Sequence, residues 1–362
     1  MVATRSWLIA LAVMSLGVVG CKKDDAPAKQ DDPGKHAVPD QKDPKPPLTK
    51  AADPDPPPAQ APAPSAAVPL AAMVGGSNPA SNADLQLLPV DSEIVGGLNV
   101  SQMQQSALWK QYMTPLVGNA APTLKSIKAA CGFDPLVTVT SVSVGLKHVM
   151  TSAPEGVFVV HGIDKAKMLG PCLAKLKTEM AKEHTKVALD GDVVTITGNK
   201  PGELVAFTFL NDNTLVGALG EKGTKAGVLE IAQGGSPLAK SAAFIDMYSR
   251  INTSESVWAL ANGNSHLLDK LAALVKPRAM YGSLNFTDTI ALDLRLRLDS
   301  ADQAKQLASM GGSQVTTAKQ FFNKLEVSAD GPDVHIGLAM TPQQIVKVQK
   351  EFGAMLGGLG GP

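Results

Sequence analysis

Alternation of apolar and polar residues marks β-strands in the second half of the chain. Between Ile290 and Leu298 an apolar residue stands at every second position, and Asp293, Arg295 and Arg297 occupy positions between them. A period of two is typical of a strand with one buried face and one face in water. We therefore expect the leucines of this strand to lie in the core and the charged side chains to face solvent.

The order of the predicted elements occurs twice along the chain. Each copy has a strand, a helix, a hairpin, a second helix and a second hairpin. In the first copy these are a strand at 92–98, a helix at 101–112, strands at 137–146 and 156–163, a helix at 164–182 and a hairpin turn at 190–192. In the second copy they are a strand at 254–260, a helix at 265–275, strands at 279–286 and 289–298, a helix at 301–323 interrupted at Gly311-Gly312, and a hairpin turn at 330–333. Both turns contain Asp and Gly, which supply the side-chain acceptor and the positive φ that tight turns need.

This pattern predicts an α+β protein with antiparallel sheets that helices cover on one face, built from two internal strand-helix-hairpin-helix-hairpin repeats. Residues 84–253 form the first repeat, which has an extra hairpin and helix at 203–232. Residues 254–356 form the second, and 357–362 are a flexible glycine-rich tail. The last helix begins at Thr341, where Pro342 and Gln344 complete a capping box.

The composition is different before residue 84. Residues 22–82 hold 14 of the 26 prolines and no aromatic residue, and their seven lysines nearly balance eight aspartates. Such a segment cannot bury a core, so we interpret residues 21–83 as a disordered tether. From Asp84 onward the chain has 25 acidic and 25 basic residues, and this balanced charge argues against nucleic acid as a partner.

The amino terminus has the form of an export signal. Arg5 precedes an apolar run from Trp7, and the run closes with Val18-Val19-Gly20-Cys21. It is shorter than the roughly 20 apolar residues of a membrane span. The pattern resembles the lipobox of bacterial lipoproteins. The resemblance implies that residues 1–20 are a signal peptide, that the Cys21 thiol receives a diacylglyceryl group, and that the new amino terminus is acylated too, for example with palmitate.

Lipidation has consequences for location and partners. Two or three acyl chains anchor a protein stably, so membrane lipid is the expected partner of Cys21. Lys22 follows the cysteine, and by the lipoprotein sorting rule this implies the outer membrane, facing either the periplasm or the cell surface. An envelope protein is the second expected partner.

Cys131 and Cys172 are the two remaining cysteines. Disulfides persist in exported proteins, so the two are expected to pair. The bond would close a loop of about 40 residues and contribute up to roughly 4 kcal/mol. The alternative is two buried thiols, since cysteine packs as a small apolar residue.

Motifs for catalysis are weak throughout the chain. Gly220-Glu221-Lys222-Gly223-Thr224 lacks the spacing of a phosphate loop and fits a strand-to-helix turn. Ser265 fits a helix cap better than a nucleophile elbow. The histidines lack the spacing of metal ligands, so we predict no catalytic residue, metal or cofactor.

The sequence therefore predicts a membrane-anchored envelope lipoprotein whose α+β part is a non-catalytic binding or structural module. The alternative is a carrier that holds a lipid or another hydrophobic ligand in an apolar cavity between sheet and helices. Only the architecture supports that alternative. An enzyme of unknown type is the third class.

Overall fold

The computed structural model describes residues 78, 82–113, 121–149, 151, 153–182, 184–200, 202–235, 237–269, 275–318 and 321–346. Its strands are β1 (Ile94–Asn99), β2 (Ser141–Lys147), β3 (Glu155–His161), β4 (Lys186–Asp190), β5 (Val193–Thr197), β6 (Leu204–Asn211), β7 (Thr214–Leu219), β8 (Val257–Asn262), β9 (Ala279–Phe286), β10 (Ile290–Arg297), β11 (Lys324–Asp330) and β12 (Asp333–Met340). The main helices are α2 (Val100–Gln105), α4 (Ala121–Cys131), α5 (Pro135–Thr138), α6 (Lys165–Lys167), α7 (Leu173–Ala181), α8 (Lys225–Ala232), α9 (Ala242–Tyr248) and α10 (Ala301–Ala318).

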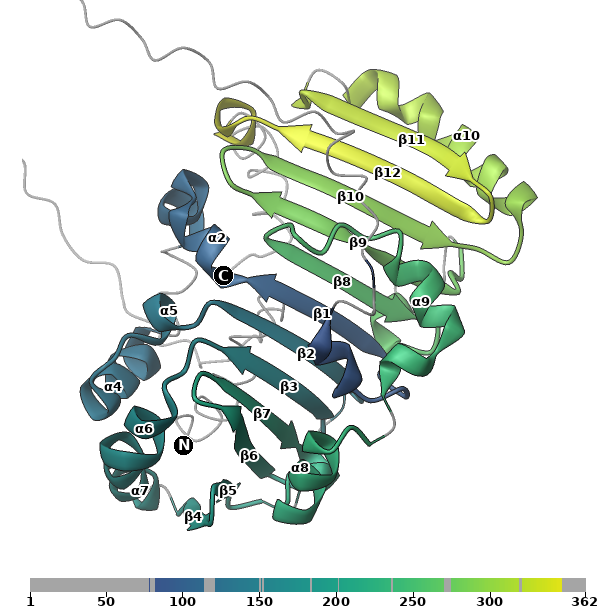
Figure 1. Ribbon diagram of the computed structural model, residues 1–362. Helices are drawn as coiled ribbons and strands as arrows, with labels where there is room; N and C mark the ends of the chain where they lie inside the picture. Colours follow the sequence, from purple (N-terminus) through teal and green to yellow (C-terminus); the bar gives the residue numbers. More distant parts are fainter. Residues whose placement is uncertain are drawn as a thin grey trace, which may run out of the picture. The chain divides into compact units, whose positions relative to one another are not determined.

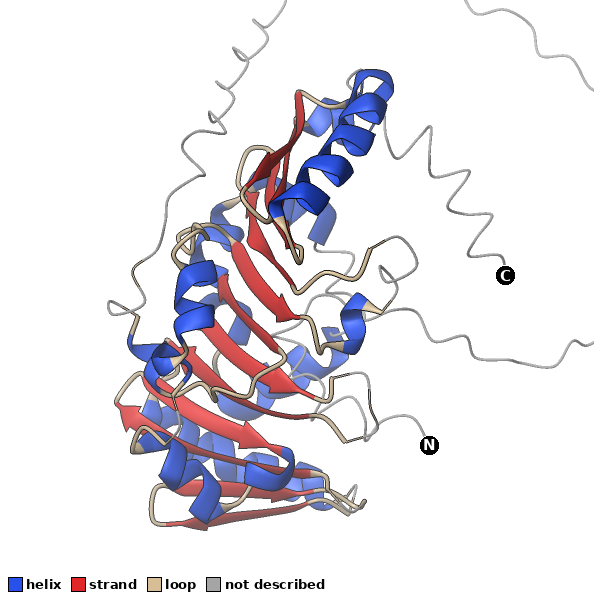
Figure 2. Ribbon diagram, turned by 90° about the vertical axis from the view of Figure 1, so that its right-hand side faces the viewer, coloured by secondary structure: helices blue, strands red, loops and turns tan. Residues whose placement is uncertain are grey.

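These strands form one antiparallel sheet of twelve in the order β11-β12-β10-β9-β8-β1-β2-β3-β7-β6-β5-β4 (Figure 1). The protein thus combines helices with a large antiparallel sheet, as the α+β prediction requires. The prediction that helices cover only one face is wrong, because helices lie on both faces (Figure 2). The reason is that the central strands are buried on both sides: Val157 and Val159 belong to one core and Phe158 to the other.

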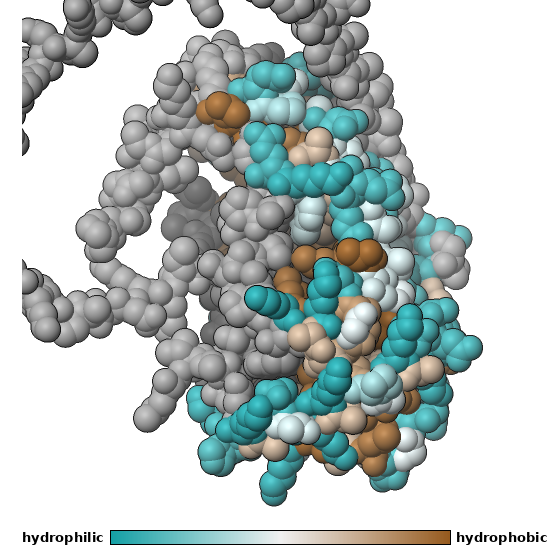
Figure 3. All heavy atoms as spheres, turned by 90° about the vertical axis from the view of Figure 1, so that its left-hand side faces the viewer, coloured by the Kyte–Doolittle hydropathy of each residue, from teal (hydrophilic) through white to brown (hydrophobic). Residues whose placement is uncertain are grey.

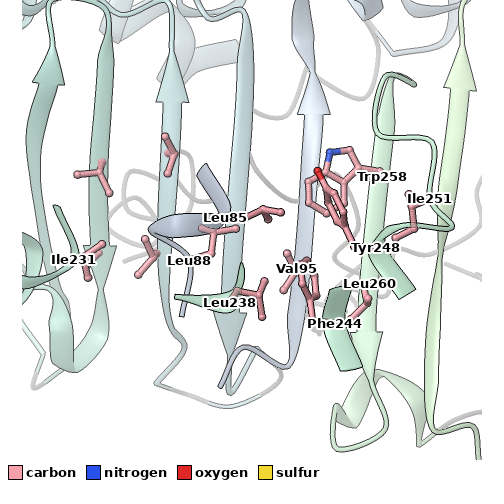
Figure 4. Packing of buried hydrophobic residues seen from close by; sticks show 14 of the residues in the cluster. Leu85, Leu88, Val95, Ile231, Leu238, Phe244, Tyr248, Ile251, Trp258 and Leu260 are labelled. Carbon is pink, nitrogen blue, oxygen red and sulfur yellow. The ribbon is translucent and has the colours of Figure 1, made fainter. Parts of the chain in front are cut away.

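We name the two faces by the helices that cover them. On the α9 face, α9 packs with the short 3₁₀ turn Ala83–Gln86 over the middle of the sheet (Figure 4), and α8 packs over β5, β6 and β7. On the α7 face, α7 packs over β2, β3, β5, β6 and β7. The long helix α10 lies on this second face too, where Ala304 and Ala308 contact Val334 of β12.

The middle of the sheet is the antiparallel pair β1 and β8, which joins the two halves. Val95 is opposite Leu260, and Gly97 is opposite Trp258. A Cβ atom at Gly97 would overlap the indole of Trp258, so glycine is needed for the ring to lie across β1. Tyr248 of α9 meets the same indole edge-on, with ring centroids 5.3 Å apart.

The predicted hairpin turns are confirmed. β4 and β5 meet at Gly191, and β11 and β12 meet at Gly331, with φ angles of 62° and 59°. The capping box at Thr341 is confirmed as well. Its hydroxyl oxygen accepts from the Gln344 backbone N–H, and the Gln344 side chain accepts from the Thr341 N–H.

Two predicted helices of the first half are broken. The helix expected at 101–112 ends at Gln105, because the Ser106 hydroxyl turns to donate to the Thr287 carbonyl and accepts from the Trp109 N–H. The helix expected at 164–182 is divided into α6, a π-type turn at Met168–Cys172, and α7. Pro171 lacks an N–H and clashes with the preceding turn, so the helix kinks at Gly170.

Three other predicted elements differ from the structure in where they begin, end or are interrupted. α10 runs through Gly311-Gly312 without interruption. The absence of a side chain at Gly311 lets the helix lie close to β11, because a Cβ atom there would be only 3.1 Å from the Val327 side chain. The strand expected from residue 137 begins at Ser141, because Asp134 caps the helical turn α5 first. Of the helix expected at 265–275, residues His266–Leu268 form a 3₁₀ turn capped by Ser265, and 270–274 lie outside the described residues.

The expected burial is reversed within β10 and holds for Leu298, just beyond it, which is 3% exposed. Asp293 and Arg295 are buried at 3% and 6% exposure, whereas the leucines within β10 are only partly buried. The charges can be buried because the register with β12 supplies partners. His335 Nε2 lies 3.1 Å from Asp293 Oδ2, and Arg295 donates to Asp330 of β11.

The most connected polar group of the α9 face centres on Asp333. Arg297 donates to both of its carboxylate oxygens, at 2.8 and 2.9 Å, and the Tyr281 hydroxyl donates to it at 2.6 Å. Arg297 also donates to Asp246 of α9, so the group joins that helix to the sheet. Burial raises the pKa of Asp333, but the hydrogen bonds from Arg297 and Tyr281 outweigh it and hold that pKa below its usual range.

We expect Asp333→Asn to lower the free energy of unfolding at neutral pH by about 3–5 kcal/mol, because it leaves the Arg297 charge without its buried partner. The stability that Asp333 contributes is present above its unfolded-state pKa of about 3.9 and is lost as pH falls through the lower folded-state pKa. The difference between variant and wild type should therefore shrink in acid. Urea unfolding at neutral and acid pH measures it.

The control is Asp192→Asn, which removes an exposed carboxylate paired with Lys165. Its effect should stay below about 1 kcal/mol. An equally small loss from Asp333→Asn would contradict a structural role for the buried network.

Candidate functional site

An apolar cavity of about 90 Å³ lies on the α7 face, between the sheet and the helices that cover it. Its floor consists of side chains from β2, β3, β5, β6 and β7, among them Val160, Phe207 and Leu215. Its cover comes from α4 and α7, which contribute Ile127 and Leu176 to the lining. Apart from a disulfide-bonded cysteine, every side chain that lines it is apolar.

The local sequence explains why the cavity has this lining. β6 and β7 are the extra hairpin of the first half, and alternate residues of both strands point to the α7 face. The kink at Gly170 and Pro171 then sets the start of α7 above them. Met168 precedes this helix and Met180 lies in its last turn, and both line the cavity with flexible thioether chains.

In the structure Cys131 and Cys172 are disulfide-bonded, with Cα atoms 3.9 Å apart. Cys131 is the last residue of α4, and Cys172 directly precedes α7. The bond therefore links the two helices that cover the cavity, and Cys131 itself forms part of the wall. Cys21, the expected lipidation site, lies outside the described residues.

The cavity has an energetic cost. At roughly 24 cal/mol per Å³, an empty apolar space of this size reduces stability by about 2 kcal/mol. Apolar cavities of this kind stay dry and accept small apolar molecules. Seen from the side of α4, α6 and α7, hydrophobic atoms reach the surface between hydrophilic ones (Figure 3). The site can therefore bind apolar groups, and its lining offers no group for acid–base chemistry.

A second cluster, of polar side chains, lies on the α9 face around His161. His161 Nε2 is 3.0 Å from Asp84 Oδ1, and Nδ1 is 3.1 Å from the Thr214 hydroxyl. The Ser143 hydroxyl donates to the other Asp84 oxygen at 2.6 Å. The cluster attaches the 3₁₀ turn Ala83–Gln86 to β2, β3 and β7. The hydrogen bond with Asp84 raises the pKa of His161, and burial opposes this only in part.

Within the described residues, no group of three or more His, Cys, Asp or Glu side chains could hold a metal ion. No described helix is long and apolar enough to cross a bilayer. Gly220 to Thr224 forms the expected strand-to-helix turn, in which the Thr224 hydroxyl caps α8.

The carrier alternative anticipated an apolar cavity between sheet and helices, but sequence reasoning did not identify the residues that line it, and it missed the Asp84–His161 pair. The cavity floor carried a signal, because Val157 to Val160 is a continuous apolar run, which is typical of strands buried on both faces. The partners of His161 are 77 and 53 residues away, so no local spacing indicates them.

No family model matches this chain, and no curated protein matches it. One solved structure, "Structure of crystal form I of TP0453", is similar with a TM-score of 0.44 and 10% sequence identity. The similarity covers 73% of this chain and 95% of that one. A TM-score below 0.5 does not establish a common fold, and no property of TP0453 is transferred.

We expect Asp84→Asn to return the pKa of His161 towards its ordinary value of about 6.5. Because the folded-state pKa is raised, the stability gained from this pair is complete below about pH 6.5 and is lost as pH rises through the folded-state pKa. The variant should therefore lose more stability in mild acid than at alkaline pH. An NMR titration of the histidine ring and urea unfolding at the two pH values measure both effects.

Asp269→Asn is the matched control, since Asp269 pairs with the fully exposed His266. It should change the titration of His266 and alter stability far less than Asp84→Asn does, because water screens an exposed ion pair. A loss for Asp84→Asn that does not depend on pH would refute the electrostatic explanation.

Proposed function

We propose that this protein is a lipid-anchored envelope lipoprotein, held by an acylated Cys21, whose folded part binds an apolar ligand without catalysis. The observation that supports the binding role is the apolar cavity between the sheet and the pair α4 and α7. The lipobox-like sequence that ends at Cys21 supports the anchor. The outer membrane is the proposed location, because Lys22 follows the cysteine.

The size of the cavity restricts the ligand. Its volume of about 90 Å³ is below the roughly 300 Å³ of a typical ligand pocket. It therefore receives a short apolar group or the end of a longer chain, and a whole lipid tail requires the cover to move. The disulfide holds α4 and α7 together, so we propose that they move as one unit over the flexible Met168 and Met180.

We also propose that the two halves of the sheet are diverged repeats. β1-β2-β3 and β8-β9-β10 run outward from the central pair, and each half ends in a hairpin, β4-β5 or β11-β12. In the sheet of the first half, β7 and β6 lie as an insertion between β3 and the closing hairpin, although they follow that hairpin in the chain. Phe207 and Leu215 of this insertion line the cavity. On this proposal the insertion gave one repeat a binding site that the other repeat lacks.

We expect Val160→Phe to fill the cavity and weaken the binding of a neutral apolar fluorophore, N-phenyl-1-naphthylamine, by about tenfold, the loss of roughly 1.4 kcal/mol of apolar contact. The measurement is a fluorescence titration of the chain from residue 21 with Cys21→Ala, free of detergent. Val137→Phe is the control. It is the same substitution of valine by phenylalanine, but Val137 lies on α5 and is 72% exposed.

Equal affinities for the two variants would mean that the fluorophore binds elsewhere. No saturable binding to either protein would refute the apolar-ligand function and favour a protein partner.

We expect metabolic labelling with palmitate to mark the wild-type chain and to be lost in Cys21→Ala, because that thiol is the proposed acceptor. Gel fluorography of cells fed labelled palmitate measures this. The double variant Cys131→Ala, Cys172→Ala should keep the label. Label retained in Cys21→Ala would refute the anchor.

A further inference from the structure

A larger hollow lies on the opposite side of the sheet from the apolar cavity. It has a volume of about 590 Å³, within the range of small-molecule sites. It is on the α9 face, where β1 begins and β8 ends, and is bordered by the start of α9 and by the segment 276–278 that leads into β9. We call it the α9 pocket.

One wall of the α9 pocket is apolar. Val95 and Leu260 are paired across β1 and β8, and Phe244 of α9 and Leu238 lie over them (Figure 4). All four side chains are at most 3% exposed and belong to the same core cluster. The wall is therefore rigid, and Val90, which is 46% exposed and lines the same pocket, supplies accessible apolar surface for a short hydrocarbon body.

The rest of the lining includes polar side chains and carries a net positive charge. Lys276 and Arg278 contribute two positive charges, and Asp299 contributes one negative charge. Arg278 uses its Nε to donate to Asp299, and in the described part of the chain its terminal nitrogens have no acceptor. The Lys276 side chain is exposed and likewise makes no ion pair with any described residue. The amide of Asn264 lies on the same side.

We propose that the α9 pocket binds a small amphiphilic carboxylate, with the hydrocarbon body against the exposed Val90 at the edge of the apolar wall and the carboxylate between Lys276 and Arg278. The terminal nitrogens of an arginine match the two oxygens of a carboxylate. A phosphate dianion is disfavoured because Asp299 leaves only one net positive charge in the pocket. This site is separate from the apolar cavity, which is on the α7 face.

The test is calorimetric titration of the full chain in nanodiscs of uncharged lipid, with hexanoate as the probe and empty discs as the blank. We expect saturable binding that weakens about tenfold in Lys276→Gln, because one charge-assisted contact is lost. Lys240→Gln is the matched control, since Lys240 is exposed nearby but does not line the pocket. The neutral analogue 1-hexanol should bind about tenfold more weakly than hexanoate.

Two further outcomes separate this site from the apolar cavity. Val160→Phe should leave hexanoate affinity unchanged. If Val160→Phe abolished the binding and Lys276→Gln did not, the carboxylate would be in the cavity and the α9 pocket proposal would be overturned. Absence of saturable hexanoate binding would overturn it as well, without bearing on the apolar fluorophore.

Discussion

The pairing of β1 with β8 is the contact on which the rest of the structure depends. It converts two sets of strands, which are distant in sequence, into one sheet of twelve. Trp258 lies across Gly97 and is itself held by Tyr248, whose hydroxyl accepts from the Asn82 side chain. The 3₁₀ turn Ala83–Gln86, the helix α9 and the central strands thus share one core, and disturbing this pair would affect both halves.

How much the sequence predicted depended on the range of the interactions involved. The hairpin of β9 and β10 and the turns at Gly191 and Gly331 follow from alternation and turn chemistry, which are local. The disulfide partners followed from cysteine count and compartment, whereas their place in the cover of a cavity did not. Helix ends were predicted wrongly where a residue distant in sequence determines them. One example is the end of α2, where the Ser106 hydroxyl donates to the Thr287 carbonyl.

The reversed burial of β10 shows why periodicity indicates two faces but not which of them is buried. Arg297 is opposite Asp333 in the register, and Arg295 is opposite His335. A carboxylate that accepts from an arginine and a tyrosine can be fully buried, because its lost hydration is replaced. An arginine in a strand therefore indicates a solvent-exposed face only when the neighbouring strands place no acidic side chain within its reach.

The apolar cavity and the α9 pocket differ in chemistry because different parts of the sheet form them. The apolar cavity requires the hairpin β6-β7 and two helices joined by a disulfide, so its lining is apolar. The α9 pocket lies at strand ends, where loops bring Lys276, Arg278 and Asp299 beside buried apolar residues. Strand ends are where backbone leaves the sheet and polar side chains can gather without the loss of a core position. A site that discriminates ligands by charge is thus expected at the edge of the core, and one that discriminates by shape and apolar surface within it.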